Sequence, residues 1–133
     1  MLVSGAGGCG VVRDTEDVKA LPEAAAKFEI EAPCAPNAAN ALVERAGEPM
    51  ELEVTAASER PGDPWVLSRG PRLVDVPLFY RVDVLPGGSS DSAIIRVFAV
   101  PKSRMVGDTR ETVSKPALLA MRIVAECAAG GAK

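Results

Sequence analysis

Histidine does not occur among the 133 residues of the chain. Imidazole is the general base of Ser-His-Asp and Cys-His catalysis, and it is the commonest metal ligand in proteins. The sequence therefore excludes most familiar hydrolase mechanisms and every metal site that contains an imidazole. No metal and no cofactor is predicted.

Aromatic residues and long apolar runs are also scarce. Aromatics make up 4% of the chain, so we expect a core of alanine, valine and leucine and few rings that could stack on nucleic-acid bases. The net charge is −3, and Arg96, Lys102, Arg104 and Arg110 are dispersed, so no nucleic-acid partner is expected. No apolar run approaches the roughly 20 residues of a membrane-spanning helix, and no transmembrane segment is predicted.

The charges are unevenly distributed along the chain. Residues 1–60 hold 11 acidic and 5 basic side chains, whereas residues 61–133 hold 7 acidic and 10 basic side chains. Two interpretations follow from this asymmetry. The halves form oppositely charged solvated faces of one fold, or the second half presents a basic face to an acidic partner.

The three cysteines, Cys9, Cys34 and Cys127, contain no C-x-x-C pair, and no zinc site is predicted. Two alternatives remain for the last two: buried inert thiols, or a Cys34–Cys127 disulfide. The disulfide would imply an oxidising compartment. Cys9 follows the small residues Ala6-Gly7-Gly8, as a lipoprotein cysteine does, so it would be a membrane tether if the chain were a truncated lipoprotein.

The N-terminal glycines Gly5, Gly7 and Gly10 spell G-x-G-x-x-G. A dinucleotide-binding fold alternates strands with crossover helices, whereas the main predicted strands of this chain lie together in a hairpin. We therefore expect residues 1–13 to be a flexible glycine-rich terminus, followed by a single domain over residues 14–133.

Periodicity and capping residues predict the elements of this domain. We expect a short helix over 16–21, a strand over 28–31, a helix over 38–46 with Asn37 as its N-cap, and a strand over 50–56. Residues 73–85 and 93–100 predict a hairpin, in which Pro77 indicates an edge or a bulge. A closing helix is expected to have Ser114 as its cap and Pro116 in its first turn.

These elements predict an α+β fold, in which an antiparallel sheet contains a central hairpin and two or three helices pack on one face. Two loops are left as binding candidates, 58–71 and 101–112. The first holds the only tryptophan, which is either an exposed anchor for another protein or a side chain that plugs the end of the sheet. The predicted partner-binding residues are Trp65, Arg69, Lys102, Arg104 and Arg110.

The first functional hypothesis is a non-enzymatic accessory subunit that binds another protein chain through these loops. The second is a secreted or envelope-tethered small binding domain that contains a Cys34–Cys127 disulfide. The third is a nucleotide-binding enzyme that uses the N-terminal glycines.

Overall fold

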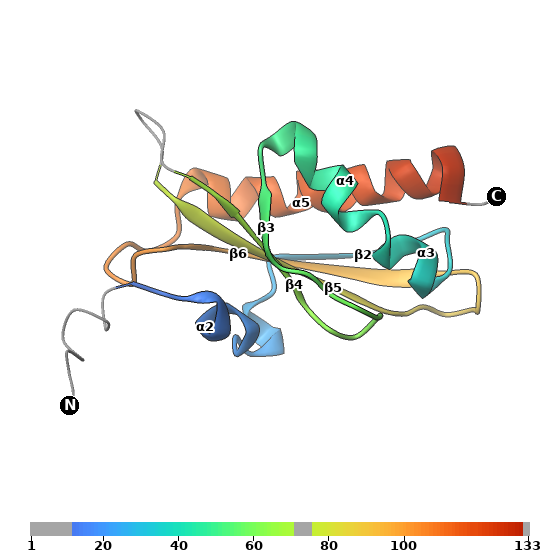
Figure 1. Cartoon of the computed structure of the whole chain (residues 1–133), viewed down its shortest axis with the longest axis horizontal. Helices are drawn as coiled ribbons and strands as arrows, with labels where there is room; N and C mark the ends of the chain where they lie inside the picture. The colour runs from blue at the N-terminus through green and yellow to red at the C-terminus, as the bar shows by residue number, and fades with distance from the viewer. Residues whose placement is uncertain (1–11, 71–75, 132–133) are drawn as a thin grey trace.

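The protein is an α+β domain built on one antiparallel sheet, as predicted. The computed structural model describes residues 12–70 and 76–131 (Figure 1). Within these residues, five strands lie in the order β2-β6-β5-β4-β3, and every neighbouring pair is antiparallel. The strands are β2 (Phe28–Ala32), β3 (Glu53–Ala56), β4 (Trp65–Arg69), β5 (Leu78–Pro86) and β6 (Ala93–Pro101). The hairpin of β5 and β6 is at the centre, which confirms the predicted central hairpin.

Helices cover both faces of this sheet, but unequally. The helices are α2 (Thr15–Lys19), α3 (Pro36–Asn40), α4 (Val43–Gly47) and α5 (Arg110–Glu126), with short turns η1 (Glu23–Ala25), η2 (Glu48–Met50) and η3 (Cys127–Gly131). Figure 1 shows α3, α4 and α5 on one face and α2 on the other. The prediction of two or three helices on one face is confirmed, and α2 is an addition on the opposite face.

The larger core lies between the sheet and the three helices of the first face. Alternate residues of the strands point into it, as the two-residue period of a strand requires. Its largest fully buried side chains are Leu67, Leu78, Tyr80, Ile95, Leu119 and Ile123. On the other face, α2 covers a smaller cluster of Val18, Val66 and Phe79.

Helix α5 begins earlier than predicted. Its N-cap is Thr109, and Thr109 and Thr112 cap each other: the Thr112 amide donates to Thr109 Oγ1 at 3.2 Å, and the Thr109 amide donates to Thr112 Oγ1 at 2.8 Å. Ser114 lies inside the helix and donates to the Arg110 carbonyl oxygen. Pro116 is buried within the helix rather than in its first turn, so tertiary packing outweighs the usual placement of proline.

The predicted helix over 38–46 is two short helices. Pro36 occupies the first turn of α3 after an extended Ala35, so Asn37 is not the N-cap. The helix breaks after Asn40, whose buried side-chain amide donates to Ser58 Oγ and whose Oδ1 accepts from the Trp65 indole. A second helix, α4, then begins at Val43.

The sequence also mispredicts parts of the sheet. Strand β4 lies within the predicted loop 58–71, and all five of its residues are buried, so it shows no alternation of polar and apolar residues. Strand β3 begins only at Glu53, because Glu51 adopts a left-handed conformation with φ of 62°. Pro77 precedes β5 and does not interrupt it; β5 is neither an edge nor bulged in its register with β6.

The N-terminal predictions fall mostly outside the described residues. The glycine motif and Cys9 lie there, and so does the nucleotide-binding hypothesis that rests on the motif. Val12 and Arg13 are described, and they lie against residues 101–103: the Arg13 amide donates to the Lys102 carbonyl oxygen at 2.7 Å. Over 12–70 and 76–131, no helix combines the length and the hydropathy that a membrane span needs.

A disulfide joins Cys34 to Cys127. The two Cα atoms are 5.7 Å apart, and both side chains are buried in the larger core. Cys34 follows β2 and Cys127 follows α5, so the bond ties the C-terminal end of α5 to the start of the domain. Of the two alternatives that the sequence left open for these cysteines, the structure contains the disulfide.

Alkylation tests the disulfide by measuring how many of the cysteines are free. Under denaturing, non-reducing conditions, iodoacetamide should modify only one of the three cysteines, Cys9, and after reduction it should modify all three. Intact mass measures both results. In the Cys34→Ser/Cys127→Ser control, reduction should make no difference, and the free energy of unfolding should fall by about 2–5 kcal/mol. Three modified cysteines without reduction would contradict the disulfide.

Candidate functional site

Of the two interpretations of Trp65, the structure has the buried side chain and not the exposed anchor. It begins strand β4, its exposed fraction is 7%, and its indole Nε1 donates to Asn40 Oδ1 at 3.0 Å. A buried indole needs such an acceptor, because an unpaired N–H in the core is costly. Trp65 therefore joins β4 to α3 and is a core residue.

Arg69 is also buried, with an exposed fraction of 6%. It ends β4 and forms a bidentate ion pair with Glu111, in the first turn of α5. Its Nη1 donates to Oε2 at 2.7 Å, and its Nη2 donates to Oε1 at 2.5 Å. The fork of a guanidinium matches a carboxylate in this geometry. Arg69 therefore lies on the face of the sheet that α5 covers rather than on a free loop.

The three remaining predicted residues belong to the segment before and at the start of α5. Lys102 Nζ lies 5.1 Å from the ring centre of Phe79. Arg104 donates to Asp17 Oδ2 at 2.6 Å, and Arg110 is the exposed first residue of α5. The Asp14 backbone amide, followed by Arg104, holds the pKa of Asp17 below its usual value. Only Arg104 and Arg110 of the five predicted residues are thus exposed to solvent.

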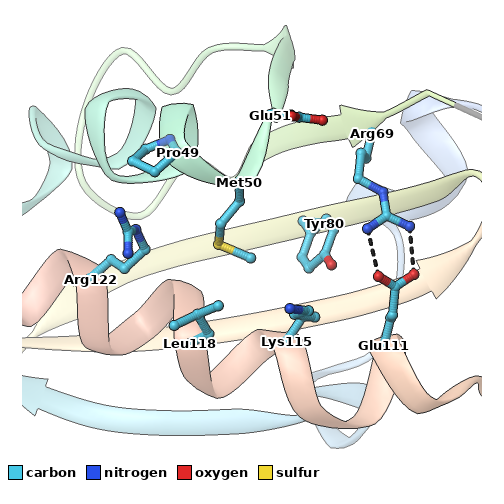
Figure 2. Close-up of a pocket in the computed structure, with 9 residues that line it drawn as sticks. All are labelled: Pro49, Met50, Glu51, Arg69, Tyr80, Glu111, Lys115, Leu118 and Arg122. Carbon is cyan, nitrogen blue, oxygen red and sulfur yellow. Dashed lines mark hydrogen bonds and ion pairs between the residues drawn. The ribbon is translucent and has the colours of Figure 1, made fainter. Parts of the chain in front are cut away.

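A cavity lies beside Arg69, between α5 and the connection from α4 to β3. Its volume is about 340 Å³. Figure 2 shows side chains from η2, β4, β5 and α5 that converge on it. The lining residues are Pro49, Met50, Glu51, Arg69, Tyr80, Glu111, Lys115, Leu118 and Arg122. We call this cavity the α5 cleft.

The α5 cleft has polar ends and a partly apolar middle. In Figure 2 the Arg69–Glu111 pair stands at one end, and Arg122 lies beside Pro49 at the other. Between them, Met50 and Leu118 approach from opposite walls, and the fully buried Tyr80 lies behind them. The cleft can therefore contact a small molecule through both charged and apolar side chains.

Of the cleft residues, only Arg69 was among the residues that the sequence singled out. One signal was present for four others: Glu111, Lys115, Leu118 and Arg122 recur at intervals of four, three and four residues, the spacing of one helix face. The opposite wall gave no such signal. Its position depends on the left-handed Glu51, where the chain turns from η2 into β3.

Three contacts hold α5 in place beside the cleft, in addition to its core packing and the Arg69–Glu111 pair. The disulfide fixes its C-terminal end, and Arg45 pairs with Glu126 at 3.4 Å nearby. At the N-terminal end, Lys27 Nζ donates to Asp108 Oδ1 at 2.7 Å. This hydrogen bond and the positive charge of Lys27 hold the pKa of Asp108 below its usual value.

Comparison with models of known protein families and with curated proteins gives no match to this chain. Within residues 12–70 and 76–131, no group of three or more cysteine, aspartate or glutamate side chains is arranged to hold a metal ion.

Replacing Asn40 should show how much the buried Trp65 depends on its acceptor. Asn40→Ala leaves the indole N–H without its partner, so the free energy of unfolding in urea should fall by about 1–3 kcal/mol. Asn37→Ala is the control, because Asn37 is exposed on the same helix; its effect should stay within about 0.5 kcal/mol. Equal effects of the two changes, or a red-shifted Trp65 emission that iodide readily quenches, would contradict the buried position.

Acid should weaken the attachment of α5 at Asp108. Because the folded-state pKa is lowered, this carboxylate stabilises the fold above its unfolded pKa of about 3.9, and the contribution is lost as the pH falls through the folded pKa. The free energy of unfolding in urea should be measured at pH 7, 5 and 3. Its decrease with falling pH should be smaller in Asp108→Asn than in the wild type, by at most about 1 kcal/mol, since the pair is exposed. Asp91→Asn, in the β5–β6 turn, is the control, and its free energy of unfolding should decrease with falling pH as much as that of the wild type. An Asp108→Asn profile that parallels the wild type would contradict the assignment.

Proposed function

We propose that the protein is a small ligand-binding domain of an oxidising compartment, and that the α5 cleft is its binding site. The observation that carries the proposal is the convergence of side chains from four elements on one cavity of about 340 Å³. Ligand sites in proteins are typically concave cavities of about 300–1,000 Å³. The cleft is at the small end of this range, so we propose a correspondingly small ligand.

The disulfide supports the proposal that the protein functions in an oxidising compartment. Disulfides persist in secreted and envelope proteins and are rare in the reducing cytosol. Cys34–Cys127 closes a loop of 93 residues and ends next to the helix that forms one wall of the cleft. An oxidising compartment would keep this wall fixed and the cavity open.

The rigidity of the walls is a second support. Arg69 and Glu111 hold β4 and α5 together at one end, and the disulfide holds α5 at its other end. A cavity between elements that are tied at both ends is largely formed before a ligand arrives, which lowers the entropic cost of binding.

The accessory-subunit hypothesis has less support. Two of its five contact residues, Trp65 and Arg69, are buried, and Lys102 lies near the ring of Phe79. Arg104 and Arg110 remain as exposed residues for a contact with another chain. We propose binding, and no reaction, for the α5 cleft.

A bulky residue in the cleft wall should block binding. The probe is 8-anilinonaphthalene-1-sulfonate, whose fluorescence rises in an apolar site. Wild type should bind it saturably, and Leu118→Trp should weaken binding at least about tenfold because the indole fills the cavity.

Met121→Trp is the matched control, since Met121 is 48% exposed on the same helix and does not line the cleft, whereas Leu118 is 39% exposed and does. Near-ultraviolet circular dichroism should show that both variants keep the fold. No saturable binding by wild type, or equal binding by the two variants, would contradict the proposed site.

A further inference from the structure

The charges of the α5 cleft do not balance within the cleft. Three lining residues are cations and two are acids. Glu111 accepts two hydrogen bonds from the Arg69 guanidinium, so this pair contributes little net charge. Lys115 and Arg122 are the other two cations, with Glu51 as the second acid.

Lys115 and Arg122 combine partial burial with the lack of a charged partner among the described residues. In the part of the chain that the structure describes, neither forms an ion pair or a side-chain hydrogen bond, although both are half-buried. Arg45, by contrast, is paired with Glu126 in the smaller hollow near the end of α5, of about 260 Å³. A half-buried cation on the wall of a cavity gives that cavity a positive potential, because low-dielectric walls concentrate the field.

The spacing of these cations places apolar surface between them. Lys115 and Arg122 are seven residues apart, which is two turns, or about 10 Å, along one face of α5. Leu118 lies between them, and Figure 2 shows Met50 across the cavity from it. A molecule seated between Lys115 and Arg122 has a cation on either side of it and two apolar side chains, Leu118 and Met50, in the middle.

We infer that the α5 cleft selects small amphipathic anions: molecules with a carboxylate, sulfonate or phosphate group attached to a compact apolar body. The anionic group pairs with Lys115 or Arg122, and the apolar body contacts Leu118 and Met50. This inference rests on the proposed function, since it names the ligand class of the same site. Arg122 is suited to a planar oxyanion through two parallel hydrogen bonds, and Lys115 acts as a point charge.

The test compares two probes that differ by one anionic group. 8-Anilinonaphthalene-1-sulfonate carries a sulfonate, and N-phenyl-1-naphthylamine is its neutral counterpart. Fluorescence titrations should give a dissociation constant at least about tenfold lower for the sulfonate, because a charge-assisted hydrogen bond is lost in the neutral probe. Added sodium chloride should weaken binding of the sulfonate and leave the neutral probe unchanged.

Charge variants assign the selectivity to the two cations. Lys115→Gln/Arg122→Gln should weaken sulfonate binding at least about tenfold and change binding of the neutral probe by less than about twofold. Arg60→Gln/Arg110→Gln is the control: it removes the same net charge from two exposed residues outside the cleft and should leave both affinities unchanged.

The outcomes separate the two proposals. If both probes bind equally and the Lys115/Arg122 variant changes neither, while Leu118→Trp blocks both, the selectivity for anions is wrong and the cleft remains a binding site. If Leu118→Trp also leaves both probes bound, the proposed site itself is wrong.

Discussion

The packing of α5 across one face of the sheet is the contact on which both the fold and the cleft depend. Leu119 and Ile123 are fully buried between the helix and the strands, and each contributes about 1.5–3 kcal/mol of hydrophobic stabilisation. Directional contacts then fix where the helix lies on that apolar surface: Arg69–Glu111 and Lys27–Asp108 near its start, and the disulfide at its end. The cavity exists because these contacts hold α5 beside η2 without closing the gap.

Local patterns predict some parts of this fold. The run 93–100 could be recognised because it is rich in β-branched and apolar residues, and the closing helix because its apolar residues recur at helical spacing. Strand β4 could not, because all five of its residues are buried and prolines precede it. The break after Asn40 depends on Trp65 and Ser58, which are 25 and 18 residues away.

The α5 cleft, too, could be predicted only in part from local patterns in the sequence. Its wall on α5 follows helical spacing and is visible in the sequence, whereas the ion pair at its end joins residues 42 positions apart. Arg69 was predicted to be functional on an exposed loop, but it lies buried in a strand because Glu111 accepts its charge. Positions that tertiary structure brings together carry no signal in any single segment, so the site could be found only in three dimensions.

The strand order has a kinetic consequence. Strand β2 pairs with β6, so Phe28 lies opposite Val97, and the disulfide likewise joins an early residue to a late one. The β5–β6 hairpin requires only a short turn, whereas each of the other two contacts must close a long loop before it contributes any energy. Long-range contacts of this kind slow folding, because the loops must close before the contacts contribute energy. We therefore expect the hairpin to form first and β2 and the end of α5 to join it later, so that the apolar face of the sheet is exposed until they do.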